Sequence, residues 1–268
     1  MKRLWTQKEE EYLINNYANL SNNEMALILD RSAGAIIDRA SRNLGLKKSD
    51  RYRRERSGNK KYSLDINYFQ SINSHEKAYW YGFLWADGCV QKNKVISLCI
   101  NKRDKETLLN FRRAIGSNHP LKEIYKTGCL QVAFRCAIMY NDLYKLNIIP
   151  RKSYSNLMPL IVDQLFSSFL LGIFDGDGHL QKNSLQITNT KETCDFINKK
   201  LLQFKLIDTS RITGTGSYAS RLYIYRQRVI NNLFKYMYQK LSCFMKRKYK
   251  RFQAMGYGDG FVLTANMK

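Results

Sequence analysis

Two apolar stretches of helix length, each ending in an aspartate followed by glycine, constrain the fold of this chain more than any other feature. They span residues 78–88 (AYWYGFLWADG) and 169–178 (FLLGIFDGDG). Gly82 and Gly172 each stand four residues before another small residue. This spacing leaves one side of each helix narrow enough for two backbones to approach closely. It therefore predicts that the two helices pack directly against each other.

The same packing brings Asp87 and Asp177 to one point at the two helix C-termini. That point is unfavourable for two carboxylates, because each lies at the negative end of a helix dipole and the two repel each other. A divalent cation bound by oxygen ligands compensates for both effects. Mg²⁺ or Mn²⁺ suits two carboxylates that must also meet a phosphate, so the sequence predicts a metal site here.

An internal repeat accompanies the two stretches. Asp177 lies 90 residues after Asp87. The same offset relates several other positions: residues 91–93 to 181–183, Val132 to Leu222, Phe134 to Ile224, and residues 143–145 to 233–235. The offset falls to 86 between residues 105–107 and 191–193 and then returns to 90. This shared register indicates two copies of one structural unit, with hairpins of different lengths.

The segments that end the two stretches, YGFLWADG and LGIFDGDG, resemble the two motifs of the LAGLIDADG homing endonucleases. The resemblance implies that Asp87 and Asp177 are metal-binding catalytic residues. It also implies that the main-chain carbonyls of Ala86 and Gly176 join the metal shell. Such an enzyme is a site-specific endonuclease that uses a divalent metal to make a staggered double-strand break in DNA.

One motif position departs from the family pattern in the first copy. This position is often acidic in the family, and it holds Trp85 in the first copy and Asp175 in the second. Because the family does not rely on this position for chemistry, the departure leaves the implied catalytic residues unchanged.

Beyond each motif the hydrophobic pattern gives the same order of elements twice. Half-buried strands alternate apolar and polar residues, and helices repeat apolar residues three or four apart. The expected strands are 95–100, 130–135, 185–188 and 221–225, and the expected helices are 105–115, 138–146, 193–204 and 229–241. The order matches the αββαββα half of the LAGLIDADG fold. The predicted fold class is α+β: two pseudo-symmetric αββαββα repeats forming a DNA-binding saddle, plus a small N-terminal three-helix domain.

The alternation also predicts which strand residues leave the core and face DNA. These are Gln131, Arg135, Gln186, Thr188, Arg221, Tyr223 and Tyr225, with Arg226 just after the last strand. Arginine and glutamine can read guanine and adenine edges in the major groove. Taken singly, each residue is about as well explained as an ordinary solvent-facing side chain as by a contact to a base. The prediction therefore concerns the outward face of the strands as a whole. Arg135 and Arg226, near strand ends, are also candidates to stabilise charge at the cleavage site.

Residues 4–47 show the pattern of three short helices. The first two open with capping boxes and the third stops at a glycine: Thr6 with Glu9, Ser21 with Glu24, and Gly45. The order resembles Myb-like and resolvase-type DNA-binding modules, in which a helix-turn-helix would present Arg39 and Arg42 to a DNA groove. A three-helix protein-interaction domain is the alternative interpretation.

A strongly basic segment, residues 48–62, follows this unit. Such runs are usually solvated linkers, but between two candidate DNA-binding units we expect Arg53 and Arg54 to track the phosphate backbone. The predicted domain boundaries are 1–47 for the helix-turn-helix, 48–62 for the linker, 63–155 and 156–255 for the repeats, and 256–268 for a tail.

The formal net charge of +23 argues for a polyanionic partner, and nucleic acid fits best. A membrane surface is the alternative, but we find no basic amphipathic anchor, no signal peptide and no apolar run long enough to span a bilayer. Six cysteines without a C-x-x-C pair are expected to be reduced and mostly buried. We therefore expect a monomer with internal pseudo-twofold symmetry on double-stranded DNA. We expect it in the cytoplasm, as a bacterial or phage-encoded protein, or in another reducing compartment that contains DNA.

Other chemistries fit these residues less well. Three histidines, His75, His119 and His179, are too few and too widely spaced for a zinc or HNH nuclease site, and residues 213–217 lack the lysine of a phosphate-binding loop. A non-cleaving DNA-binding regulator and an RNA-splicing maturase on the same fold are the rival functions. Retention of both aspartates favours cleavage, because a regulator has no electrostatic reason to keep two converging carboxylates.

Overall fold

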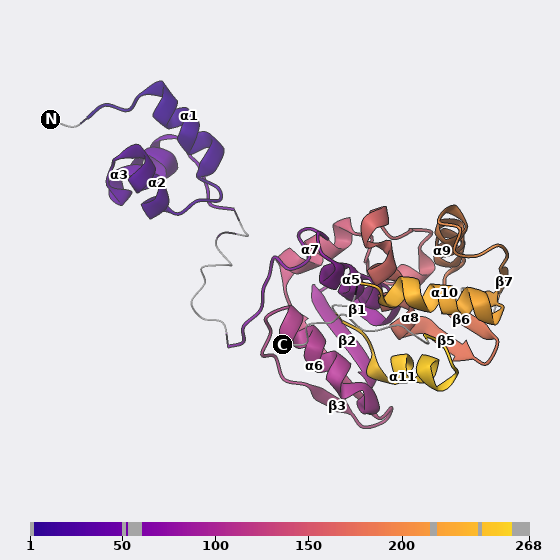
Figure 1. Ribbon diagram of the computed structural model, residues 1–268. Helices are drawn as coiled ribbons and strands as arrows, with labels where there is room; N and C mark the ends of the chain where they lie inside the picture. The colour runs from indigo at the N-terminus through magenta and orange to yellow at the C-terminus, as the bar shows by residue number, and fades with distance from the viewer. Residues whose placement is uncertain (1–2, 50–51, 53–60, 215–218, 241–242, 259–268) are drawn as a thin grey trace. The chain divides into compact units, whose positions relative to one another are not determined.

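The computed structural model describes residues 3–49, 52, 61–214, 219–240 and 243–258 (Figure 1). The chain divides into two compact units, residues 1–61 and 62–268. Within the described ranges, no helix has both the length and the apolar content needed to cross a membrane.

Residues 3–49 of the smaller unit form three helices around a small core. They are α1 (Gln7–Asn16), α2 (Asn22–Leu29) and α3 (Ala33–Ile37), and α3 continues as a π-helical turn over Asp38–Asn43. Both predicted capping boxes are present, at Thr6 and Ser21. Gly45 has a φ of 67°, a conformation that glycine adopts without strain, so the chain can turn away there. The core residues are Leu13, Tyr17, Met25, Ile36 and Ala40.

A buried ion pair joins α1 to the turn before α3. Arg31 Nε lies 2.9 Å from Glu9 Oε1, and the two side chains are only 7% and 9% exposed. The hydrogen bond from Arg31, followed by that from the Thr6 main chain, lowers the pKa of Glu9 from 4.5 to about 2. Because the folded-state pKa is depressed, this stabilisation is complete above about pH 4.5 and is lost as the pH falls towards 2.

We expect Arg31→Met to destabilise the smaller unit by up to about 3 kcal/mol, because it leaves the buried Glu9 carboxylate with only the more exposed Arg3, at 2.9 Å, as a cationic partner. Amide hydrogen exchange over α1 to α3 at pH 7 measures the change. Arg42→Met is the matched control, since Arg42 is 77% exposed and pairs with Asp38 along one helix face. The control should change stability by no more than about 0.5 kcal/mol, and an equal effect of both variants would contradict the role of the buried pair.

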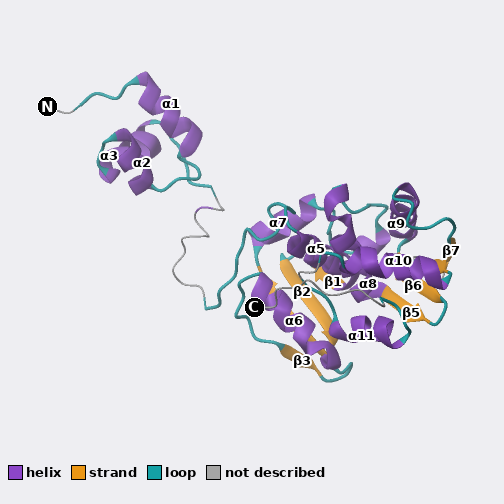
Figure 2. Ribbon diagram, in the orientation of Figure 1, coloured by secondary structure: helices purple, strands orange, loops and turns teal. Residues whose placement is uncertain are grey.

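The larger unit contains two repeats of the predicted type (Figure 2). The first repeat comprises α5 (His75–Asp87), β1 (Gly88–Val90), β2 (Val95–Asn101), α6 (Lys105–Ala114), β3 (Lys122–Ile124), β4 (Cys129–Arg135) and α7 (Ala137–Lys145). Its four strands form an antiparallel sheet in the order β1-β2-β4-β3, here called the first sheet.

The second repeat follows the same plan. It comprises α8 (Phe166–Asp177), β5 (Gly178–Gln181), β6 (Ser184–Asn189), α9 (Lys191–Gln203), β7 (Arg211–Gly214), β8 (Ser220–Tyr225) and α10 (Gln227–Tyr238). Its strands form the antiparallel second sheet, in the order β5-β6-β8-β7. The predicted α+β class and the αββαββα order of both repeats are confirmed.

One further helix, α11 (Lys246–Ala254), follows the second repeat and was not predicted. Its sequence, KRKYKRFQA, is strongly basic and offers only two large apolar residues to a core. Tyr249 and Phe252 are nevertheless buried, and Phe252 packs against Phe174 and Phe234. The helix therefore packs against the end of α8 through aromatic contacts, which the hydrophobic periodicity of its sequence does not predict.

The helices α5 and α8 cross at their glycines, as the spacing predicts. In Figure 1 both lie in the middle of the larger unit, with β2 on one side and β5 and β6 on the other. A Cβ atom at Gly82 would overlap the main-chain oxygen of Phe169, and a Cβ atom at Gly172 would overlap that of Tyr79. These two contacts are related by the 90-residue offset, so the crossing lies on a pseudo-twofold axis between the repeats.

The predicted alternation along the strands is confirmed, apart from three outward positions that are buried, Ser97, Ser184 and Gln186. Val132, Phe134, Leu222 and Ile224 are buried, and their neighbours form the opposite, outward row. Gln186 occupies the outward row but is only 8% exposed, because its Nε2 donates to Ser184 Oγ and its neighbours across the sheet are large.

The prediction that most cysteines are buried was wrong. All six lie within the described residues and none forms a disulfide, but only Cys136 and Cys194 are buried. Cys89, Cys99 and Cys129 lie instead on the outward row of the first sheet, where the alternation of β1, β2 and β4 places them.

Candidate active site

The two motif aspartates meet where α5 and α8 end. Asp87 and Asp177 are the last residues of these helices, and a Cβ atom added at Gly176 would lie 3.3 Å from Asp87 Oδ2. Burial, and next the charge of Asp87, raise the pKa of Asp177 from 3.8 to about 7. The structure thus brings together the two carboxylates that the sequence places at one point.

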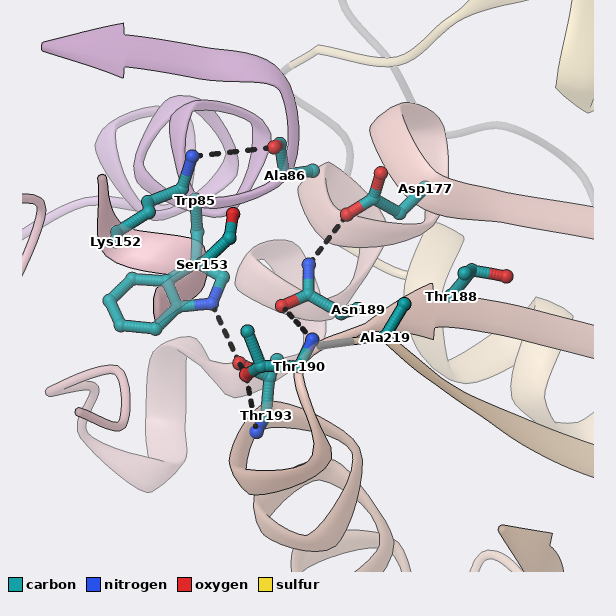
Figure 3. A pocket seen from close by; sticks show the side chains of 10 residues that line it. All are labelled: Trp85, Ala86, Lys152, Ser153, Asp177, Thr188, Asn189, Thr190, Thr193 and Ala219. Atoms are coloured by element: carbon teal, nitrogen blue, oxygen red, sulfur yellow. Dashed lines mark hydrogen bonds between the residues drawn. The ribbon is translucent and has the colours of Figure 1, made fainter. Parts of the chain in front are cut away.

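The two carboxylates differ in their surroundings. Asn189 Nδ2 donates a 2.5 Å hydrogen bond to Asp177 Oδ2 (Figure 3). Burial also raises the pKa of Asp87, and the charges of Lys248 and Lys152 act against this rise. Asp177 is partly buried and Asp87 is exposed, and the reduced hydration of both carboxylates favours either a proton or a nearby cation.

Two lysines approach the ends of the motif helices in equivalent ways. Lys152 Nζ donates to Gly88 O at 2.7 Å and to Ala86 O at 3.5 Å. Lys248 Nζ donates to Gly178 O at 2.7 Å and to Gly176 O at 3.4 Å, and also to Phe174 O at 2.5 Å. These paired carbonyls are again 90 residues apart. Each helix C-terminus thus receives one ammonium group, which suits the negative end of its dipole.

Burial lowers the pKa of both ammonium groups, that of Lys248 to about 8. Neither lysine was predicted from the sequence. They are 96 residues apart and so fall outside the 90-residue register. The available signal was their position, since Lys152 follows the end of the first repeat and Lys248 lies in the basic run after the second.

The arginines predicted to assist the site lie elsewhere. Arg135 Nε donates to Asn93 O at 2.8 Å, at the turn between β1 and β2. Arg226 is 67% exposed at the start of α10, with Asp208 at 3.9 Å. Among the described basic residues, the charges that act on both aspartates are those of Lys152 and Lys248.

The donor atoms at this point fit a hard divalent cation. The carboxylates of Asp87 and Asp177 and the nearby carbonyls of Ala86 and Gly176 are all oxygen ligands, which Mg²⁺ and Mn²⁺ accept. Within the described residues, no group of three or more histidine, cysteine or acidic side chains is arranged to hold a metal. A cation between the carboxylates would also offset their mutual repulsion.

A cavity of about 240 Å³ opens beside Asp177 and Lys152 (Figure 3). Hydroxyl groups line much of it, from Ser153, Thr188, Thr190 and Thr193. Trp85 closes one side, and its Nε1 donates to Thr193 Oγ1 at 3.0 Å. The tryptophan at the less typical motif position therefore links α5 of one repeat to α9 of the other.

Asp175, the counterpart of Trp85, makes a different link. It is 1% exposed and accepts hydrogen bonds from the Tyr79 hydroxyl at 2.9 Å and from the main-chain N–H of Met245 at 2.7 Å. Burial raises its pKa to about 7. Because Met245 directly precedes α11, this bond fixes the start of the helix that carries Lys248.

A second cavity, of about 350 Å³, reaches the site at Lys248 and is basic. Its polar lining comes from Arg103, His179, Arg247, Lys248 and Arg251. Arg251 uses only its Nε for the Leu180 carbonyl, at 2.8 Å. The two flanks of the site therefore differ, with hydroxyl groups on one and cationic groups on the other.

Most residues predicted to face DNA lie on the outward rows of the sheets. Gln131 and Arg135 lie on β4, Thr188 and Gln186 on β6, and Arg221, Tyr223 and Tyr225 on β8. Arg226 follows β8 and caps α10.

The two arginines of the N-terminal unit that are predicted to contact DNA both form ion pairs within the unit. Arg39 forms an ion pair with Glu10, and Arg42 pairs with Asp38 at 2.8 Å. The Arg39 side chain is therefore held against α1 by its ion pair, whereas the Arg42 side chain remains mostly exposed. Arg53 and Arg54 lie outside the described residues.

No protein-family model and no curated protein matches this sequence. Similar solved structures include full-length WhiA from Thermatoga maritima, at 18% identity and a TM-score of 0.46, covering 75% of this chain and 67% of that one. They also include the I-LtrWI LAGLIDADG homing endonuclease bound to target DNA, at 13% identity and a TM-score of 0.45, covering 71% and 90%. The meganuclease I-SmaMI bound to uncleaveable DNA shares 12% identity at a TM-score of 0.48, covering 67% and 88%.

Proposed function

We propose that this chain is a site-specific endonuclease of double-stranded DNA that makes a staggered double-strand break by hydrolysing phosphodiester bonds. The observation that carries the proposal is the meeting of two carboxylates, Asp87 and Asp177, with the half-buried Lys152 and the buried Lys248 at one pseudo-symmetric point. Two equivalent sets of groups suit two equivalent reactions, one on each antiparallel DNA strand. Both sets belong to one chain, so a monomer is sufficient.

Each part of the site has a role in this reaction. A bound Mg²⁺ or Mn²⁺ supplies a water of lowered pKa and neutralises charge on the phosphate. Asp87 and Asp177, with the carbonyls of Ala86 and Gly176, would hold the cations. Lys152 and Lys248 place positive charge beside the scissile phosphates, where negative charge grows in the transition state.

The remainder of the larger unit supplies binding. The net charge of +23 favours a polyanion, and the outward rows of the two sheets carry side chains able to contact base edges. The hydroxyl-lined and basic cavities flank the site and suit the sugar-phosphate backbone. We propose that the basic residues of the smaller unit and the segment after it add phosphate contacts.

Cleavage of a plasmid library that carries randomised inserts tests the proposal. We expect linear product with Mg²⁺ or Mn²⁺ and binding without cleavage in Ca²⁺. The rival functions predict other outcomes. A DNA-binding regulator would retain the same insert in every metal without cutting it, and a maturase would bind a structured RNA in preference to duplex DNA.

Lys152→Met and Lys248→Met are each expected to lower the cleavage rate at least 100-fold while affinity stays within about tenfold, because each removes a charge that acts mainly in the transition state. Single-turnover cleavage and binding in Ca²⁺ measure the two quantities. Lys246→Met is the matched control on α11, because this side chain is 54% exposed and pairs with Glu106. Equal rate losses at Lys246 and Lys248 would contradict the assignment.

A further inference from the structure

The outward rows of the two sheets correspond residue by residue. In the first sheet Cys99 faces Gln131, Ser97 faces Ala133, and Cys89 faces Ser97. In the second sheet Thr188 faces Arg221, Gln186 faces Tyr223, and His179 faces Gln186. Each outward position of one repeat therefore has a counterpart at the same place in the other. Gln131 and Arg221 are one such pair.

Arg221 is held in one orientation before any ligand arrives. Its Nε donates to Thr188 Oγ1 at 3.1 Å, and its Nη1 donates to the Tyr223 hydroxyl at 3.1 Å. The Tyr223 ring in turn stacks on Tyr225, with centroids 6.0 Å apart and planes within 2°. These bonds use two of the five guanidinium N–H groups. The other three form a fixed set of donors on the outward side of the sheet.

A fixed set of donors selects among base edges. Guanine presents two neighbouring acceptors, N7 and O6, in the major groove, whereas adenine presents the N7 acceptor beside the N6 donor. A guanidinium can only donate, so it matches guanine and meets an unpaired donor on adenine. Because Thr188 and Tyr223 already restrain Arg221, less side-chain freedom is lost when it binds.

Gln131 offers different chemistry at the equivalent place. Its carboxamide carries both a donor and an acceptor, which matches the N6 and N7 pattern of adenine. Its neighbours on the outward row are the short side chains of Cys99 across the sheet on β2 and of Ala133 and Cys129 two residues away on β4, and the longer Lys122 across the sheet on β3. The first sheet therefore has no counterpart of the hydroxyl groups that orient Arg221.

The neighbouring outward positions of the two sheets differ in the same way, with longer side chains on the second sheet. In the second sheet this row carries His179 and Tyr223, which are long enough to hydrogen-bond a base edge, on either side of Gln186, which is only 8% exposed. The first sheet carries Cys89, Ser97 and Ala133 at the corresponding positions. Short side chains of this kind offer at most a hydroxyl or an apolar contact to a base, so this row of the first sheet discriminates less.

We infer that the DNA target is asymmetric at the two base pairs related by the pseudo-twofold axis, with guanine read by Arg221 and adenine read by Gln131. The inference rests on the proposed function for its duplex DNA ligand. It adds that the half-site under the second sheet is read at more positions than the half-site under the first.

Binding selection tests this inference without cleavage. The full chain is incubated in Ca²⁺ with a duplex library randomised over the whole site, and the retained DNA is sequenced. The expected consensus has a G·C pair and an A·T pair at positions symmetric about its centre, with stronger preferences on the G·C side. Arg221→Gln should convert the guanine preference to adenine, and Gln131→Arg should do the reverse. Each swap should change discrimination roughly 5- to 150-fold at that position alone.

Arg228→Gln is the matched control, because it makes the same chemical change in the same repeat on an exposed residue of α10, away from the outward row. It should leave the consensus unchanged. Identical bases at the two symmetric positions, or an Arg221→Gln variant that keeps its guanine preference, would overturn the inference. Plasmid cleavage by the wild type would be untouched by that outcome, so the base assignment and the nuclease assignment fail separately.

Discussion

Replacing Asp87 or Asp177 by asparagine is expected to abolish double-strand cleavage while leaving affinity for the target within about tenfold, roughly 1.4 kcal/mol. An amide keeps the shape of the side chain but loses the charge that would hold a divalent cation. Asparagine at position 177 can still accept the hydrogen bond from Asn189. Supercoiled plasmid in Mg²⁺ and labelled duplex in Ca²⁺ measure cleavage and binding separately.

Folding stability decides whether these aspartates serve the reaction or the fold. In the absence of divalent metal, the charge of Asp87 and the reduced hydration of Asp177 both destabilise the ionised pair. Either asparagine variant should therefore be as stable as the wild type without metal, or more stable by up to about 2 kcal/mol. Asp208→Asn, at a 78% exposed side chain, is the control and should keep full cleavage. Unfolding of the Asp87 or Asp177 variant would instead assign that residue a structural role.

The features that the sequence predicts correctly are those that obey a local rule. The crossing of α5 and α8 follows from Gly82 and Gly172, because a missing Cβ allows close approach whatever surrounds it. The strand faces follow from strict alternation, which β-geometry imposes on every strand. The meeting of Asp87 and Asp177 then follows from the repeat, since equivalent residues next to a pseudo-twofold axis must come close together.

The features that the sequence misses depend on contacts between distant segments. Lys152 and Lys248 follow the last helices of the two repeats, α7 and α10. No hydrophobic periodicity predicts that they contact the C-terminal ends of α5 and α8. Lys248 further depends on α11, which docks through Phe252 and through the bond between Asp175 and the Met245 main chain. Arg39 was expected at a DNA groove but pairs with Glu10, because two helices bring these charges together.

Replacing Gly82 or Gly172 by alanine is expected to destabilise the larger unit by at least about 3 kcal/mol. In each case the new methyl group would overlap a main-chain carbonyl of the facing helix, at Phe169 or Tyr79. Backbone cannot rotate aside as a flexible side chain can, so α5 and α8 must separate along their contact. Urea unfolding followed by circular dichroism measures the loss.

Gly214→Ala provides the matched control, because a Cβ atom there meets nothing within 4 Å. It should change stability by no more than about 0.5 kcal/mol. Separation of the helices would also move Asp87 away from Asp177, so any folded Gly172→Ala protein should lose cleavage more severely than its stability alone explains. A Gly172→Ala variant with wild-type stability and cleavage would show that the two backbones do not touch at this crossing. The shared site that depends on their contact would then have no structural basis.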